Sequence, residues 1–130
     1  MKLLNTLFEI VESIDSSSGF SVTIRIKPDH IVYKGHFPGY PVTPGVVFIQ
    51  MVHELVEHHL KKTIRLVEIS NCKFLKIVNP EKESLATFST SVTSENGLLH
   101  VKASGKNSSG NFLRLDIVYT DASRKKTSEG

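Results

Sequence analysis

The feature that most constrains the fold is a rigid segment rich in proline and glycine at residues 35–45. Its sequence is Gly35-His36-Phe37-Pro38-Gly39-Tyr40-Pro41-Val42-Thr43-Pro44-Gly45. Each proline fixes its own φ angle and disfavours the α conformation in the residue before it, so this segment can be neither a helix nor a central strand. We therefore expect a stiff, bent loop that presents His36 and leads directly into a helix.

A helix is predicted directly after this loop, over residues 46–61. Apolar residues cover nearly all sides of its first two turns, which indicates burial on most sides. Pro44 suits a helix start, and Gly45 lets another group approach the backbone there. The free N–H groups of the first turn suit a carbonyl that develops negative charge. His36 and this helix start form a candidate site; the alternative is a structural loop in which the histidine caps a backbone group.

The rest of the chain carries strand patterns. Phe20, Val22, Ile24 and Ile26 alternate with polar residues, which predicts a strand with one buried face. Strands are expected over residues 7–14, 20–27, 66–75, 86–93, 98–105 and 112–119, with turns at 94–97 and 106–110. One helix against five to six antiparallel strands makes an α+β domain, residues 1–120, with a curved sheet around the helix. Its open edge favours dimerisation, and residues 121–130 are expected to be a disordered tail.

Composition excludes several classes of protein. The chain has 130 residues, enough for a single domain, and a net charge of +3. It lacks a basic stripe interleaved with aromatic residues, which argues against binding nucleic acid. Cys72 is the only cysteine, so no internal disulfide forms; in its apolar run we expect a buried, inert thiol in a reducing compartment. No apolar run is long enough to span a membrane and no signal peptide is recognisable, so we expect a cytoplasmic protein.

Histidines near the end of the predicted helix raise the question of a metal. The run His53-Glu54-Leu55-Val56-Glu57-His58-His59 has Glu57 where a zincin motif requires histidine. His53 and His58 also fall on different faces of a helix, so we interpret the run as a solvated helix end of mixed charge. Neither a nucleophile elbow nor a phosphate-binding glycine loop is present. We expect no metal and no cofactor.

Residues 35–46 strongly resemble the active-site motif of the hotdog-fold 3-hydroxyacyl-acyl-carrier-protein dehydratases. A second stretch, residues 71–80, is similar to a strand and turn of that family whose motif begins with Lys-Phe. In this chain these two residues are Lys73 and Phe74. The order of strands, loop, helix and further strands also fits. The resemblance covers about residues 5 to 120, and its first motif is the specific one.

The resemblance implies a mechanism at a dimer interface without a metal or organic cofactor. The histidine matching His36 takes and returns the α-proton of a 3-hydroxyacyl thioester, and the backbone N–H matching Gly45 polarises the carbonyl. An acidic residue from the partner's helix protonates the leaving hydroxyl. The substrate arrives on the phosphopantetheine arm of an acyl carrier protein, for which Lys73 and Lys76 are candidate contacts. The substrate-binding positions implied are Phe37, Pro44, Val46 and Phe74.

The chain departs from the family pattern at the acid, where it has Gln50. An amide can orient a hydroxyl or a water, but it cannot donate a proton as an acid near neutral pH. Three alternatives follow. Gln50 orients water in a slower or altered dehydratase; Glu54, one helical turn further on, supplies the carboxylate; or the chain binds acyl thioesters without dehydrating them.

We expect an enzyme of the hydro-lyase class that removes water from a 3-hydroxyacyl thioester in fatty-acid or related polyene synthesis. It would act as a homodimer, a higher homo-oligomer or a heterodimer. The alternative is a non-catalytic binding or partner subunit of the same fold. A hotdog thioesterase ranks third, because His36 lies in a motif of the dehydratase type.

Overall fold

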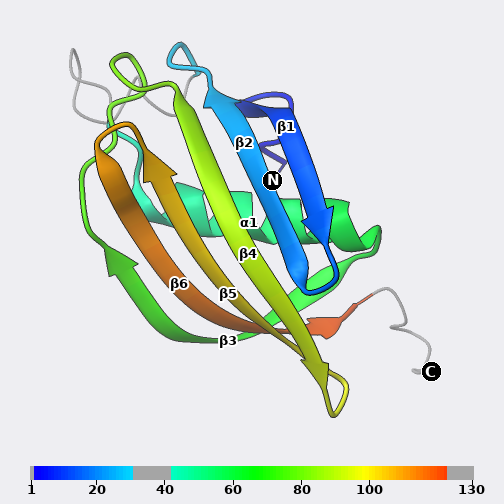
Figure 1. Cartoon of the computed structure of the whole chain (residues 1–130). Coiled ribbons are helices and arrows are strands. Elements are labelled where there is room, and N and C mark those ends of the chain that lie inside the picture. Colours follow the sequence, from blue (N-terminus) through cyan, green and yellow to red (C-terminus); the bar gives the residue numbers. More distant parts are fainter. Residues whose placement is uncertain (1, 31–41, 123–130) are drawn as a thin grey trace.

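A computed structural model describes residues 2–30 and 42–122 of the chain (Figure 1). Its elements follow the expected order of two strands, a helix and four strands. They are β1 (Phe8–Ser16), β2 (Gly19–Ile26), α1 (Gly45–Leu60), β3 (Ile64–Phe74), β4 (Leu85–Glu95), β5 (Leu98–Asn107) and β6 (Gly110–Asp121). Most of the expected tail, from residue 123 on, lies outside the described residues.

The six strands form one antiparallel sheet in the order β1-β2-β4-β5-β6-β3. The chain crosses from β2 through α1 to β3 at the far edge, and β4 then returns beside β2. Figure 1 shows the sheet curving around α1, which lies against its inner face. The predicted α+β architecture, a hotdog fold, is confirmed.

The core lies between the inner face of the sheet and α1. In β2 the four apolar residues of the alternating pattern are buried, as predicted, while Arg25 is exposed. The helix adds Val47, Phe48, Met51, Val52, Leu55 and Val56 to the core. Burial of these side chains against the sheet provides most of the stability of the helix.

Two hairpin turns show where the sequence predicts backbone conformation well and where it does not. Asn96 and Gly97 have φ angles of 54° and 80°, as expected for a tight Asn-Gly turn between β4 and β5. The turn predicted at residues 106–110 is too long. β5 continues to Asn107 and β6 begins at Gly110, because paired strands carry polar residues on their exposed face.

The strand predicted over residues 66–75 is β3, and it is largely exposed. It forms one edge of the sheet, and Leu66, Val67 and Ile69 are 45%, 51% and 39% exposed. Cys72 is partly buried, and this burial raises the pKa of its thiol. The thiol therefore stays protonated near neutral pH, consistent with the expected inert cysteine.

Candidate functional site

The helix start has the geometry that the sequence predicts. Pro44 is the N-cap residue with extended backbone angles, and Gly45 is the first residue of α1. The N–H of Thr43 donates to the carbonyl of Val78 at 3.0 Å, which ties this segment to the chain beyond β3. No side chain of the described residues caps the helix start, and its first turn has no acidic residue. Its backbone N–H groups and positive dipole end therefore suit an oxyanion.

The aromatic ring of Phe74, at the end of β3, lies directly against Gly45. A Cβ atom placed on Gly45 would come within 2.5 Å of this ring, so no larger residue fits without moving it. Two residues that the family resemblance assigns to one site are therefore in contact.

Apolar side chains are exposed around this point. Val46 is 70% exposed, and Phe74, Leu75 and Ile77 are 51%, 50% and 71% exposed. We call these four residues the helix-start patch. Val46 is the exception to the predicted burial of the first turns of the helix, in which Val47, Phe48, Met51 and Val52 are buried. Exposed apolar clusters of this kind mark binding or assembly surfaces.

His36 and Phe37 lie outside the described residues, which resume at Val42. Pro44, Gly45 and Val46 form the helix start, where the ring of Phe74 lies against Gly45, and Gln50 lies further along the same helix. The roles assigned to these residues remain predictions.

Gln50 and Glu54 are joined by a hydrogen bond. Nε2 of Gln50 donates to Oε2 of Glu54 at 2.8 Å. The backbone N–H of Leu3 also donates to the Glu54 carboxylate, at 2.9 Å to Oε1 and 2.8 Å to Oε2, and the N–H of Leu4 donates to Oε1 at 2.7 Å. Glu54 is only 4% exposed. The N-terminal segment and Gln50 thus share one buried carboxylate, which we call the Glu54 clasp.

The clasp corrects the interpretation of residues 53–59 as a solvated helix end. Glu54 is buried, and two of the histidines are paired with carboxylates. His53 Nε2 lies 3.2 Å from the Glu57 carboxylate, and His59 Nδ1 lies 3.1 Å from Asp15. Glu57 also accepts a hydrogen bond from the N–H of Ile64 at 3.0 Å. Within residues 2–30 and 42–122, no group of three or more potential ligands could hold a metal ion.

Tyr119 is a buried polar residue that the sequence analysis did not single out. Its ring packs edge-on against His53, and its hydroxyl has no hydrogen-bond partner among the described residues. Burial, with a smaller contribution from the charge of Glu57, raises the pKa of Tyr119 well above its usual value. The phenol is therefore held in its neutral form inside the core.

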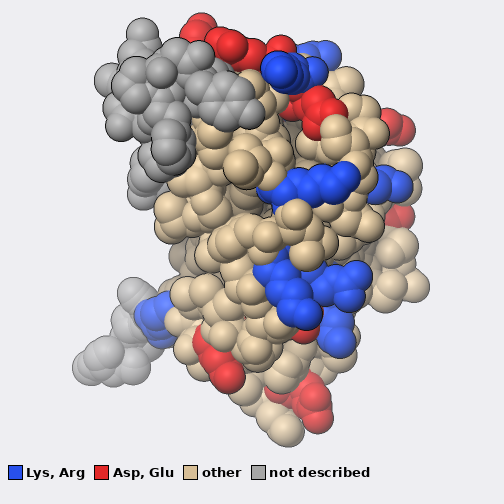
Figure 2. All heavy atoms as spheres, turned by 90° about the vertical axis from the view of Figure 1, so that its left-hand side faces the viewer, with Lys and Arg blue, Asp and Glu red and all other residues tan. Residues whose placement is uncertain are grey.

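Figure 2 views the molecule from the left-hand side of Figure 1, and Lys and Arg side chains gather across the middle of this side. Lys73 of β3 is paired in register with Arg114 of β6. Lys76 is engaged by the turn between β5 and β6, since its ammonium group donates to the Ser109 carbonyl. Of the two lysines considered as contacts for a carrier protein, Lys73 therefore adjoins another cation, whereas Lys76 is held by a carbonyl.

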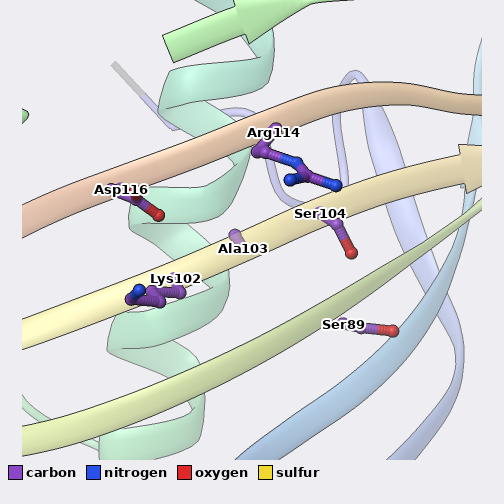
Figure 3. A pocket seen from close by; sticks show the side chains of 6 residues that line it. All are labelled: Ser89, Lys102, Ala103, Ser104, Arg114 and Asp116. Carbon is purple, nitrogen blue, oxygen red and sulfur yellow. The ribbon is translucent and has the colours of Figure 1, made fainter. Parts of the chain in front are cut away.

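A shallow pocket of about 260 Å³ lies on the outer face of the sheet. Figure 3 shows its lining on β4, β5 and β6, with α1 behind the sheet: Ser89, Lys102, Ala103, Ser104, Arg114 and Asp116. The sheet separates this pocket from the Glu54 clasp. Its lining is polar apart from Ala103, so it does not suit an acyl chain.

The Glu54 clasp is the feature of the site that is hardest to predict from the sequence. Its donors are the backbone N–H groups of Leu3 and Leu4, which every residue except proline carries, and they lie far from Glu54 in the sequence. A buried glutamate on an amphipathic helix has no distinct signature, so only the fold reveals the contact.

No helix among the described residues is long and apolar enough to cross a membrane.

Comparison with curated proteins finds dehydratases. The chain is 32% identical over 77 residues to the 3-hydroxyacyl-[acyl-carrier-protein] dehydratase FabZ of Lactiplantibacillus plantarum, a match that covers 54% of this chain and 52% of that protein. The FabZ protein of Lactobacillus helveticus is 30% identical over 77 residues, covering 54% and 52% of the two chains. The chain spans about half the length of the curated relatives it matches.

Solved structures share the fold. The dehydratase heterocomplex ApeI:P from Xenorhabdus doucetiae matches with a TM-score of 0.65 and 18% identity, covering 85% of this chain and 96% of that one. A hypothetical thioesterase with coenzyme A from Streptococcus pneumoniae matches with a TM-score of 0.62 and 13% identity, covering 88% and 84%. Identities this low show the fold alone, and proteins of both kinds share it.

The family comparison is more specific. The model of the ApeI-like family, described as ApeI dehydratase, matches residues 12–111. This match takes in the proline-rich loop, α1 and the strands from β2 to β5, and so includes both stretches on which the resemblance was based. The chain therefore belongs to the ApeI-like dehydratase family.

Proposed function

We propose that this chain is a subunit of a dehydratase that removes water from a 3-hydroxyacyl thioester carried by an acyl carrier protein. The observation that carries the proposal is the start of α1, where Gly45 has no room for a side chain beneath the ring of Phe74. A glycine there lets a thioester carbonyl approach the backbone N–H groups at the helix start.

The chemistry assigned to the site is an elimination. His36 takes the α-proton, the electrons of the C–H bond form the C=C bond, and the C–O bond at the 3-position breaks. The N–H of Gly45 stabilises the negative charge that develops on the thioester oxygen. The leaving hydroxide must acquire a proton to become water. The Gln50 amide has no acidic proton to give, so this proton must come from the imidazolium formed at His36 or from an acid on a partner subunit.

The Glu54 clasp weighs against a role for Glu54 as the missing acid. Both of its oxygens already face N–H donors, from Leu3, Leu4 and Gln50, at 2.7 to 2.9 Å. An acid must be protonated before it can donate, and the hydrogen of a protonated Glu54 carboxyl group would lie close to the hydrogens of these donors. We therefore assign the contact with the 3-hydroxyl to Gln50 and a supporting role to Glu54.

A second subunit completes the proposed site. β3 is an edge strand with exposed apolar residues, which suits antiparallel pairing with another copy or with a related chain. In a homodimer both sites would contain Gln50. In a heterodimer with an acid-bearing partner, one site would combine His36 and Gly45 of this chain with the partner's acid. The relative from Xenorhabdus doucetiae, which is described as a heterocomplex, favours this second candidate.

The test uses the purified chain with a 3-hydroxyacyl-acyl-carrier-protein and follows the enoyl product by mass spectrometry. Product that exceeds that of a His36→Ala control supports catalysis by the chain alone. No product above this control, but product on addition of an acid-bearing family member, supports the heterodimer. Release of a free thiol instead of an enoyl product would indicate a thioesterase.

A further inference from the structure

The pocket on the outer face of the sheet, which we call the outer-face pocket, brings hydrogen-bond donors together from three strands. Ser89 of β4 pairs in register with Ser104 of β5, and Ser104 pairs with Arg114 of β6. Figure 3 shows the side chain of Arg114 extending from β6 toward Ser104. A guanidinium group donates hydrogen bonds and both serine hydroxyls can donate, so this end of the pocket suits an anion.

The positive charge at the outer-face pocket is not compensated within the described part of the chain. Neither Arg114 nor Lys102, the second cation of the lining, forms an ion pair with any of residues 2–30 and 42–122. Lys73 of β3 stands opposite Arg114 in register, and like charges in this position destabilise a sheet. A bound anion would relieve this repulsion.

We infer that the outer-face pocket binds the phosphate group of a small molecule. A tetrahedral phosphate has enough oxygens to accept from Arg114, Ser89 and Ser104 at once, and a guanidinium group can bind two of them in parallel. The volume of about 260 Å³ holds a phosphate group with few further atoms. The inference is independent of the proposed function, because α1 lies on the other face of the sheet.

Asp116 determines which end of the pocket the anion takes. It pairs in register with Lys102, two residues along β6 from Arg114. Its carboxylate repels an anion, and so confines the phosphate to the end formed by Arg114 and the two serines. A carboxylate also accepts hydrogen bonds, so Asp116 suits a hydroxyl group of the same ligand. The phosphate could thus be free or belong to a sugar phosphate, and only the second offers Asp116 a hydroxyl.

The experiment titrates the chain with inorganic phosphate and, in parallel, with ribose 5-phosphate, at constant pH and ionic strength. Backbone amide resonances of β4, β5 and β6 around the pocket should shift and saturate. Arg114→Gln should weaken binding of both compounds about tenfold or more, because a hydrogen bond from a charged donor is lost. Ser104→Ala should weaken it about threefold, since its hydroxyl is neutral.

Arg65→Gln is the matched control. Arg65 is an exposed arginine of β3, paired in register with Thr120, and it does not line the pocket. The substitution removes the same charge and should leave both affinities unchanged. Unshifted resonances of residues buried between the sheet and α1 verify that each variant is folded.

The two compounds also distinguish the sources of the phosphate. Tighter binding of ribose 5-phosphate, with its advantage lost in Asp116→Ala, supports a sugar phosphate, whereas equal binding supports free phosphate.

Three results would overturn the inference. In the first, sodium chloride alone produces the same shifts. In the second, Arg114→Gln and Arg65→Gln weaken binding equally, which would indicate general screening of charge. In the third, an acidic carrier protein shifts these resonances while neither phosphate compound does, which would make the outer face a protein-docking surface.

Discussion

Phe74 and Gly45 are mutually constrained: the aromatic ring fills the space that any side chain at the helix start would need. The contact joins the first residue of α1 to the end of β3, and thus links two motifs that lie far apart in the sequence. The effects of substitutions at these two residues on stability should therefore be coupled, which makes the pair suitable for a double-mutant cycle.

Gly45→Ala should displace the Phe74 ring and lower the free energy of unfolding by about 1 kcal/mol, because the new Cβ atom overlaps the ring. In a Phe74→Ala background the same change should have no such effect, since the obstruction is gone. Urea denaturation of the four proteins provides the measurement. Equal effects of Gly45→Ala in both backgrounds would show that the ring is not the constraint.

Restoring an acid at position 50 should require a second change. Gln50→Glu alone would set a carboxylate against the buried carboxylate of Glu54, which now accepts from Gln50 at 2.8 Å. We expect this variant to be less stable and to gain little activity. When Gln50→Glu is combined with Glu54→Gln, the hydrogen bond can be kept with its direction reversed, because the amide at position 54 can donate to the carboxylate at position 50.

The double variant should dehydrate 3-hydroxyacyl-carrier-protein about 10²-fold faster than the native chain, the usual contribution of a general acid. Initial rates of enoyl formation for the two single variants and the double variant decide the matter. A single Gln50→Glu variant as active as the double one would contradict the role given to Glu54.

Loss of the Glu54 clasp should destabilise the chain. Glu54→Ala leaves the N–H groups of Leu3 and Leu4 without their acceptor and should lower the free energy of unfolding by about 3 kcal/mol. Hydrogen exchange at these two amides should accelerate in the folded protein. Glu57→Ala is the control, and should leave the exchange of both amides unchanged.

Tyr119→Phe should stabilise the chain by about 1 kcal/mol at neutral pH, because it removes a buried hydroxyl that has no partner among the described residues. It should also change the response to alkali. Burial raises the pKa of Tyr119 in the folded state, so above about pH 10 the unfolded chain has lost the proton that the folded chain retains.

The unfolded state then binds fewer protons, and the free energy of unfolding falls as the pH rises. Denaturation at pH values from 8 to about 11 should show a steeper fall for the native chain than for Tyr119→Phe. If the free energy of unfolding fell equally with pH in the two proteins, the raised pKa of Tyr119 would be refuted.

Pairing through β3 predicts a difference between the two sheet edges. Val67→Lys places a charge on β3 and should convert an oligomer into a monomer. Ile14→Lys makes the same kind of change on β1, the strand at the other edge of the sheet, and should leave the assembly intact. The native Ile14 is 58% exposed, so it is a matched control. Light scattering coupled to size-exclusion chromatography distinguishes these outcomes, and a monomeric native chain would remove the basis for pairing.

The parts of the fold that could be predicted from sequence are those with local causes. Alternation in Phe20–Ile26 fixes the buried face of β2, and Pro44 followed by Gly45 marks the start of α1. The contact of Phe74 with Gly45 could be anticipated only through the resemblance, since the two residues meet in the fold alone.

Other features depend on partners that leave no trace in the sequence. The Glu54 clasp uses backbone donors, so a polar position on an amphipathic helix was expected to be solvated and is buried instead. β3 is apolar although its residues lie at an edge, and its pattern resembles that of a strand inside a sheet. The sequence cannot separate these cases, because exposure depends on which strand ends up outermost.

The position of β3 also bears on how the chain folds. Although β3 follows α1 directly, its neighbour in the described sheet is β6, the last strand, with Phe74 beside Leu113 and Ile64 beside Asp121. Pairing between strands so distant along the chain forms slowly, because a long loop must close first. During synthesis Phe74 would remain unanchored until β6 has emerged, so the candidate site would be among the last parts of the molecule to mature.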